Sequence, residues 1–95
     1  NSRIYHNLGD AYTDMGDYKK AVIAYKKSIK LDSSHADTYT SLGVVYGALG
    51  KYREAIAFYK HALEINPVYV NALNNLGAAY YAVGKREKAV YFYNK

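Results

Sequence analysis

Apolar residues recur along this chain at the three- and four-residue spacing of one face of an α-helix. The first such stretch carries Ile4, Tyr5, Leu8, Ala11 and Tyr12, and no stretch competes as a strand. We therefore expect an all-α fold. The spacing predicts helices over residues 3–15, 18–31, 37–49, 52–65, 70–83 and 86–94.

These helices belong to a repeat. The pattern Leu-Gly-x-x-Tyr begins at Leu8, Leu42 and Leu76, so it returns every 34 residues. Three copies in a 95-residue chain indicate a stack of similar small units rather than one irregular globule. Turns of two to five residues between the predicted helices force neighbouring helices to run antiparallel.

Glycine ends the first helix of each unit, at Gly16, Gly50 and Gly84, where it suits the residue just past a helix end. Asp17 follows the first of these glycines and is predicted to cap the next helix, because its carboxylate accepts hydrogen bonds from free N–H groups. The other two units have lysine there and lack this cap.

The repeated residues resemble the tetratricopeptide repeat family, whose first helix carries an aromatic residue, Leu-Gly and Tyr, and whose second carries Ala, an aromatic residue, Ala and Pro. The resemblance covers essentially the whole chain. Ser28 and Ser33 depart from the pattern in the first unit, and Leu73 and Arg86 in the third. The middle unit matches best, with Tyr39, Leu42, Gly43, Tyr46, Ala55, Tyr59, Ala62 and Pro67.

The resemblance implies a right-handed α–α superhelix, or solenoid, of antiparallel helix pairs with about 2.75 units. We expect one domain over residues 1–95. Its repeats are expected over 2–35, 36–69 and 70–95, the last truncated and without a capping helix. First helices are implied to line a concave groove that binds a peptide or partner protein, and second helices to form the convex back. Catalysis, where family members have it, usually belongs to a separate domain, so we do not expect an enzyme.

Composition sets further limits. Half the residues are hydrophobic, so disorder is not expected, and none of the apolar runs reaches the about 20 residues that span a bilayer. The absence of cysteine excludes disulfides and thiolate metal sites, and it suits a reducing compartment such as the cytoplasm. Because the chain begins at Asn1 rather than Met, we expect it to be part of a longer scaffold or adaptor protein.

Residues off the Leu-Gly-Tyr face are the candidates for the groove by equivalence with the family. Thr13 and Gly47 share this side. The candidate groove residues are Arg3, His6, Asn7, Asp10 and Asp14 in the first unit, Asp37, Thr40, Ser41, Val44 and Ala48 in the second, and Asn71, Asn74, Asn75, Ala78, Tyr81 and Ala82 in the third.

The wall formed by the small residues of this set would leave room for bulky side chains of a partner, with Tyr81 as an aromatic anchor. Alternatively, it is simply a solvated helix face. The three asparagines suit gripping an extended peptide backbone, since an amide both donates and accepts. The alternative is helix capping by Asn71 and solvation of Asn74.

The acidic groups Asp10, Asp14 and Asp37 favour a partner with a basic residue near repeat 1. They argue against the terminal carboxylate that the family's chaperone-binding members grip. His6 and Asp10 lie one helical turn apart, but two ligands are too few for a tight metal site. Neither a metal nor a cofactor is expected.

The net charge of +5 is unevenly distributed, because the predicted second helices and their flanks carry +7 and the first helices carry −2. A basic back could bind nucleic acid, but a solubilising face is the simpler interpretation, so nucleic acid is not expected. A third alternative is a regulatory repeat segment of a multidomain enzyme. The predicted uncapped end, at Ala79, Val83 and Val90, suggests end-to-end self-association through the third repeat. The alternative is a chain that is only marginally stable in solution.

Overall fold

The structure, a computed structural model of the chain, describes residues 1–85, 88, 91 and 92. Its helices begin and end within one residue of the predicted positions. Most of the expected helix over 86–94 lies outside the described residues, although Lys88, Tyr91 and Phe92 are helical. The helices are α1 (Ser2–Asp14), α2 (Tyr18–Leu31), α3 (Ala36–Ala48), α4 (Tyr52–Ile65) and α5 (Val70–Ala82).

The predicted helix-ending glycines and the predicted cap at Asp17 are confirmed. Gly16, Gly50 and Gly84 have φ angles of 78°, 79° and 84°, in the left-handed region that glycine reaches without strain. The carboxylate of Asp17 accepts a hydrogen bond from the backbone N–H of Lys20 at 3.3 Å, as expected for a helix cap. Each first helix is therefore stopped sharply, and the chain reverses within a few residues.

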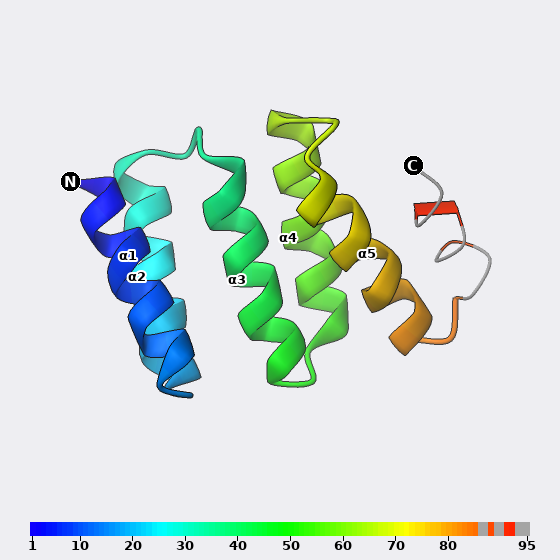
Figure 1. The fold of residues 1–95 in the computed structure, drawn as a ribbon, viewed down its shortest axis with the longest axis horizontal. Helices are drawn as coiled ribbons and strands as arrows, with labels where there is room; N and C mark the ends of the chain where they lie inside the picture. The colour runs from blue at the N-terminus through cyan, green and yellow to red at the C-terminus, as the bar shows by residue number, and fades with distance from the viewer. Residues whose placement is uncertain (86–87, 89–90, 93–95) are drawn as a thin grey trace.

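The helices stack in antiparallel pairs along the long axis of the molecule (Figure 1). The helix α1 packs on α2 and α3 on α4, while α2 covers α3 and α4 covers α5. The first helices also approach one another in series, α1 with α3 and α3 with α5, whereas the backbones of α2 and α4 stay farther apart. First helices therefore converge on the inner side of the stack. The molecule measures 39 × 25 × 17 Å, which corresponds to two layers of helices.

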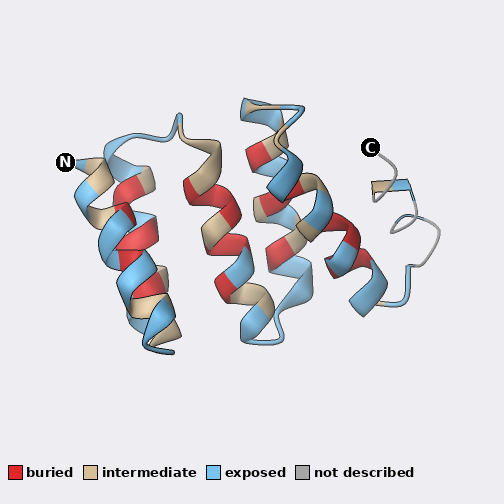
Figure 2. Cartoon of the chain, in the orientation of Figure 1, coloured by how far each residue is buried: buried red, intermediate tan, exposed pale blue. Residues whose placement is uncertain are grey.

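Buried residues line the helix faces that meet within this stack (Figure 2). Gly9 and Gly43 lie directly against the rings of Tyr25 and Tyr59. A Cβ added at either glycine would come within 2.5 Å of a ring carbon. The tyrosine can therefore cross beneath the first helix only where that helix carries glycine.

The third unit repeats the packing of the second. Phe92 stacks on Tyr80 with ring centroids 5.5 Å apart, as Phe58 stacks on Tyr46 at 5.2 Å. The expectation that Ala79 faces water is wrong, because it packs against α4 and is only 5% exposed. Val83 is half-buried and Val90 lies outside the described residues.

At the edge of the stack formed by α1 and α2, apolar side chains are more exposed. Leu42 and Leu76 are fully buried because a preceding second helix covers them, whereas the equivalent Leu8 is 40% exposed. Ile4 and Ile23, on α1 and α2, are also exposed. The apolar stripe predicted for the first helix is therefore only partly buried.

Candidate functional site

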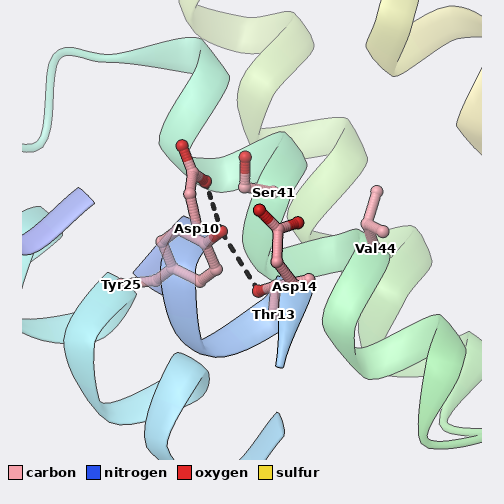
Figure 3. Close-up of a pocket in the computed structure, with 6 residues that line it drawn as sticks. All are labelled: Asp10, Thr13, Asp14, Tyr25, Ser41 and Val44. Carbon is pink, nitrogen blue, oxygen red and sulfur yellow. Dashed lines mark hydrogen bonds between the residues drawn. The ribbon is translucent and has the colours of Figure 1, made fainter. Parts of the chain in front are cut away.

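Two pockets follow each other along the inner side of the first helices. The first pocket has a volume of about 310 Å³ and lies between α1, α2 and α3 (Figure 3). It is lined by Asp10, Thr13, Asp14, Tyr25, Ser41 and Val44. The second pocket, of about 290 Å³, lies between α3, α4 and α5. It is lined by Gly47, Tyr52, Ala55, Tyr59, Asn75, Ala78, Ala79 and Ala82.

The hydroxyl of Tyr25 organises the first pocket. It donates a hydrogen bond to Asp10 Oδ1 at 2.5 Å and lies 3.3 Å from the hydroxyl of Thr13 (Figure 3). Burial of the ring and the bond to Asp10 raise the pKa of Tyr25 to about 12, so the hydroxyl keeps its proton at neutral pH. The exposed carboxylate of Asp14 lies on the same side of α1. This pocket therefore presents two carboxylates.

A second polar cluster joins the first two units beside this pocket. The guanidinium of Arg3 donates to both carboxylate oxygens of Asp37, at 3.2 and 2.9 Å. Burial alone would raise the pKa of Asp37, but the hydrogen bond and charge of Arg3 outweigh it and hold that pKa below its usual range. The charge of Asp37 is thus compensated within the protein, and Asp10 and Asp14 carry the acidity of the groove.

His6 also belongs to this junction. Its ring is buried, with Nδ1 at 2.8 Å from the hydroxyl of Thr38 and Nε2 at 3.4 Å from a carboxylate oxygen of Asp10. Thr40 is buried as well, and its hydroxyl donates to the backbone carbonyl of Ala36. His6 and Thr40, both predicted for the groove, therefore have polar partners within the protein.

The other candidates are more accessible. Half-buried positions are held by Arg3, Asp37, Ser41 and Asn75. Exposed positions are held by Asn7, Asp10, Asp14, Val44, Ala48, Asn71, Asn74, Ala78, Tyr81 and Ala82. Asn71 does not cap α5, because the N-cap residue of this helix is Tyr69 and no side chain caps it. The pockets bring together only Asp10, Asp14, Ser41 and Val44 in one group, and Asn75, Ala78 and Ala82 in the other.

The sequence pattern does not predict Tyr25 or Tyr59 as groove residues. Both come from second helices, yet each lines a pocket on the inner side. The signal was present in the repeat, because each tyrosine is paired with the first-helix glycine that lets the ring pass. That pairing joins residues in different helices, which a helical periodicity within one segment does not reveal.

Several lysines of the back, among them Lys26 and Lys60, lie over tyrosine rings. Lys26 of α2 lies 5.7 Å from the centroid of Tyr46, and Lys60 of α4 is equally far from the centroid of Tyr80. Both pairs join consecutive units, so these lysines take part in cation–π packing of the stack. This favours the structural interpretation of the basic back over a nucleic-acid surface.

The part of the chain that the structure describes contains no group of three or more side chains placed to hold a metal ion. None of its helices is both long and apolar enough to cross a lipid bilayer.

The fold and its inner surface define a solenoid of helical repeats. Sequence profiles of the tetratricopeptide repeat match residues 2–67 and, separately, residues 48–94. The chain belongs to the tetratricopeptide repeat family, as its repeated residues predict, and its fold is the right-handed superhelix of antiparallel helix pairs. Members of this family are protein-interaction modules. A search of curated protein sequences finds no match.

Solved structures share this fold. The MamA chain of one crystal structure is 31% identical in sequence to this chain and has a TM-score of 0.95. The match covers 99% of this chain and 55% of the MamA chain. A second MamA structure is 31% identical, with a TM-score of 0.94 over 99% of this chain and 51% of its own. This chain therefore spans about half the length of MamA. The first TPR of Spaghetti (RPAP3), bound to the HSP90 peptide SRMEEVD, is 27% identical, with a TM-score of 0.96 over 98% of this chain and 74% of its own.

Proposed function

We propose that this chain is the ligand-binding part of a larger scaffold or adaptor protein and that it binds an extended peptide along its inner side. The observation that carries the proposal is the pair of pockets arranged in series on the first helices. Binding of the HSP90 peptide by the similar repeats of Spaghetti supports peptide binding as the function of this fold. Helices that are already packed lose little conformational entropy when a peptide docks.

The charge of the first pocket points to a ligand with a lysine or arginine near repeat 1. Asp10 is oriented by the hydroxyl of Tyr25, and Asp14 is exposed beside it. A cationic side chain entering this pocket would meet both carboxylates, whereas an acidic one would be repelled. The HSP90 peptide bound by Spaghetti is acidic, so we propose a ligand of opposite charge for this chain.

Binding of fluorescent peptides, measured by anisotropy, tests this proposal. We expect a set of extended peptides with a central lysine to bind more tightly than the same peptides with glutamate. Replacing both pocket acids, Asp10→Asn with Asp14→Asn, should weaken the lysine peptides about tenfold and reduce the dependence of binding on salt.

The matched control changes the opposite face of the molecule. The double variant Lys26→Glu, Lys27→Glu alters charge on α2 without changing a residue of either pocket. Because Lys26 and Lys27 also lie over the rings of Tyr46 and Tyr5, a melting curve checks that the variant is folded. We expect it to leave peptide affinity unchanged. The proposal would be overturned if this variant abolished binding while the Asp10 and Asp14 variant bound normally, because the basic back would then be the binding surface.

A further inference from the structure

The two pockets occupy equivalent places in consecutive repeats, but their chemistry differs. Tyr25 and Tyr59 are 34 residues apart and fill the same position beneath a first helix. The residues that surround the tyrosine hydroxyl differ between the two repeats. One repeat further along the chain, the equivalents of Asp10, Thr13 and Ser41 are Val44, Gly47 and Asn75, and of these Gly47 and Asn75 line the second pocket.

This exchange leaves the hydroxyl of Tyr59 without the partners that Tyr25 has. Neither Val44 nor Gly47 has a side chain that can accept a hydrogen bond. Within the described residues, the Tyr59 hydroxyl makes no hydrogen bond, although the residue is only 5% exposed. Because none of the buried side-chain nitrogen and oxygen atoms in the described part of the chain lacks a partner, this hydroxyl is the part of Tyr59 that reaches the surface, where it is free to pair with a ligand.

The hydroxyl of Tyr59 is directed at the inner side of the stack. A Cβ added at Gly47 would lie 4.0 Å from its oxygen, so the hydroxyl lies just beneath the groove-facing side of α3. The bare backbone of Gly47 leaves the hydroxyl open to the pocket. Threonine at the equivalent position of the first unit instead lies against the Tyr25 hydroxyl.

The other groups of the second pocket restrict what could pair with this hydroxyl. All eight lining residues are uncharged, so a carboxylate or an ammonium group would be desolvated there without a counter-charge. Asn75 adds an amide that both donates and accepts. The volume of about 290 Å³ is at the lower limit for small-molecule sites, and it suits a single side chain.

We propose that the second pocket is a subsite for a side-chain carboxamide, that of glutamine or asparagine, carried by the peptide in the groove. The carboxamide oxygen accepts a hydrogen bond from the Tyr59 hydroxyl, and its NH₂ group donates to the amide oxygen of Asn75. An aliphatic side chain would fill the space but leave the hydroxyl unpaired. This inference rests on the proposed function and names the ligand group of the same groove.

The protonation of Tyr59 is consistent with a donor role. Burial raises the pKa of its hydroxyl to about 12, so the proton is retained at neutral pH.

The first test scans glutamine, glutamate and leucine through each position of a lysine-containing peptide that binds the protein. We expect one position at which glutamine binds about fivefold more tightly than leucine, the factor that corresponds to one net hydrogen bond of about 1 kcal/mol. Glutamate should bind more weakly still. Equal affinities for glutamine and leucine at every position would overturn the subsite.

Variants assign the preference to its residue. Tyr59→Phe should abolish the preference for glutamine over leucine while preserving the preference for lysine over glutamate in the first pocket. Tyr25→Phe, the matched control, should preserve the preference for glutamine. Melting curves check that both variants fold. A glutamine preference that survives in Tyr59→Phe would contradict the proposal.

Converting the second pocket into a copy of the first is the most stringent test. In the double variant Val44→Asp, Gly47→Thr, the Tyr59 hydroxyl gains the kinds of partner that Tyr25 has, and we expect the preferred residue at the scanned position to change from glutamine to lysine. Because Val44 also lines the first pocket, the preference for lysine over glutamate in that pocket is measured in the same variant. No change in preference would count against the subsite.

A titration with propionamide tests the pocket without a peptide. We expect millimolar propionamide to shift the side-chain NMR signals of Asn75 in the unmodified chain but not in Tyr59→Phe, and propionate to shift neither. If lysine peptides bind without any glutamine preference and propionamide has no effect, only the subsite fails. If no peptide binds but propionamide does, the proposed function fails while the carboxamide site stands.

Discussion

At the residue scale, the two equivalent tyrosines show how neighbouring side chains decide the role of a buried group. Tyr25 and Tyr59 are 1% and 5% exposed, and each ring packs against a glycine. Only the hydroxyl of Tyr25 has a carboxylate, that of Asp10, that accepts its hydrogen bond. The tyrosine hydroxyl at this repeat position is therefore bonded within the protein in the first unit and available to a ligand in the second.

This difference predicts opposite results for one substitution. Tyr25→Phe loses a hydrogen bond to a carboxylate and should lower the free energy of unfolding by about 1–2 kcal/mol. Tyr59→Phe loses no protein hydrogen bond and should change it by less than about 0.5 kcal/mol. Urea unfolding followed by circular dichroism measures both. A larger loss for Tyr59→Phe would show that its hydroxyl is paired within the protein.

Both tyrosines also predict how stability depends on pH. Their pKa values in the folded state, about 12, lie above the ordinary value of 10.0. The stabilisation from keeping these hydroxyls protonated is therefore complete below pH 10 and is lost as the pH rises to 12, because the unfolded chain releases the protons first. The melting temperature should fall over this interval. It should fall less in the double variant Tyr25→Phe, Tyr59→Phe, each scan being compared with its own value at pH 9.

At the scale of the helix, α3 carries two glycines with different functions. Gly43 faces the ring of Tyr59, where a Cβ would come within 2.5 Å of a ring carbon. At Gly47 the nearest atom to an added Cβ is 4.0 Å away, which is an ordinary contact. Packing between helices requires the first glycine, whereas the second one keeps the second pocket open.

Alanine at these two positions should therefore act in opposite directions. Gly43→Ala should lower the free energy of unfolding by about 1–3 kcal/mol because the ring or the helix must move. Gly47→Ala should raise it by about 0.5–1 kcal/mol, since glycine is a poor helix former. Thermal and urea unfolding check both. Stabilisation by Gly43→Ala would contradict the close packing described above.

At the scale of the whole molecule, each unit depends on the helix that covers its first helix. Leu42 and Leu76 are fully buried under such a helix, and Leu8 has none over it in the described structure. The exposed Ile4 and Ile23 lie on the same pair of helices, and a hollow of about 340 Å³ opens beside Leu8. Solenoids commonly need polar capping at such an edge.

Leucine truncation should reflect this position in the stack. Leu42→Ala should cost about 2–5 kcal/mol of folding free energy because it leaves a cavity between α2 and α3. Leu8→Ala should cost about 1 kcal/mol, since the site is partly hydrated already. Equal losses in denaturant unfolding would show that Leu8 is covered in solution.

Self-association is the corresponding prediction for the 95-residue chain. We expect its mass in sedimentation equilibrium to rise with concentration as exposed apolar edges pair end to end. Leu8→Glu should keep the chain monomeric if the α1 edge takes part. A single-chain mass at all concentrations would exclude this pairing.

The sequence by itself determined the helices, their ends and the stacking of similar units. Helical periodicity and the glycines with left-handed backbone angles are local properties, so a few neighbouring residues are enough to predict them. The repeat also predicts a groove side. Asp10, Asp14 and Asn75, from that predicted set, line the two pockets, and their role in binding a partner is a proposal.

Only the tertiary structure decided which polar groups are already occupied. Arg3 pairs with Asp37, and His6 lies within hydrogen-bonding distance of Thr38, in each case across more than thirty residues of chain. Those partners occupy side chains that the sequence pattern offers as free groove residues, while Tyr59, from a second helix, lines the second pocket. The physical reason is that a hydrogen-bonding group is satisfied by whatever lies within about 3 Å in space, and periodicity along one helix does not record that neighbour.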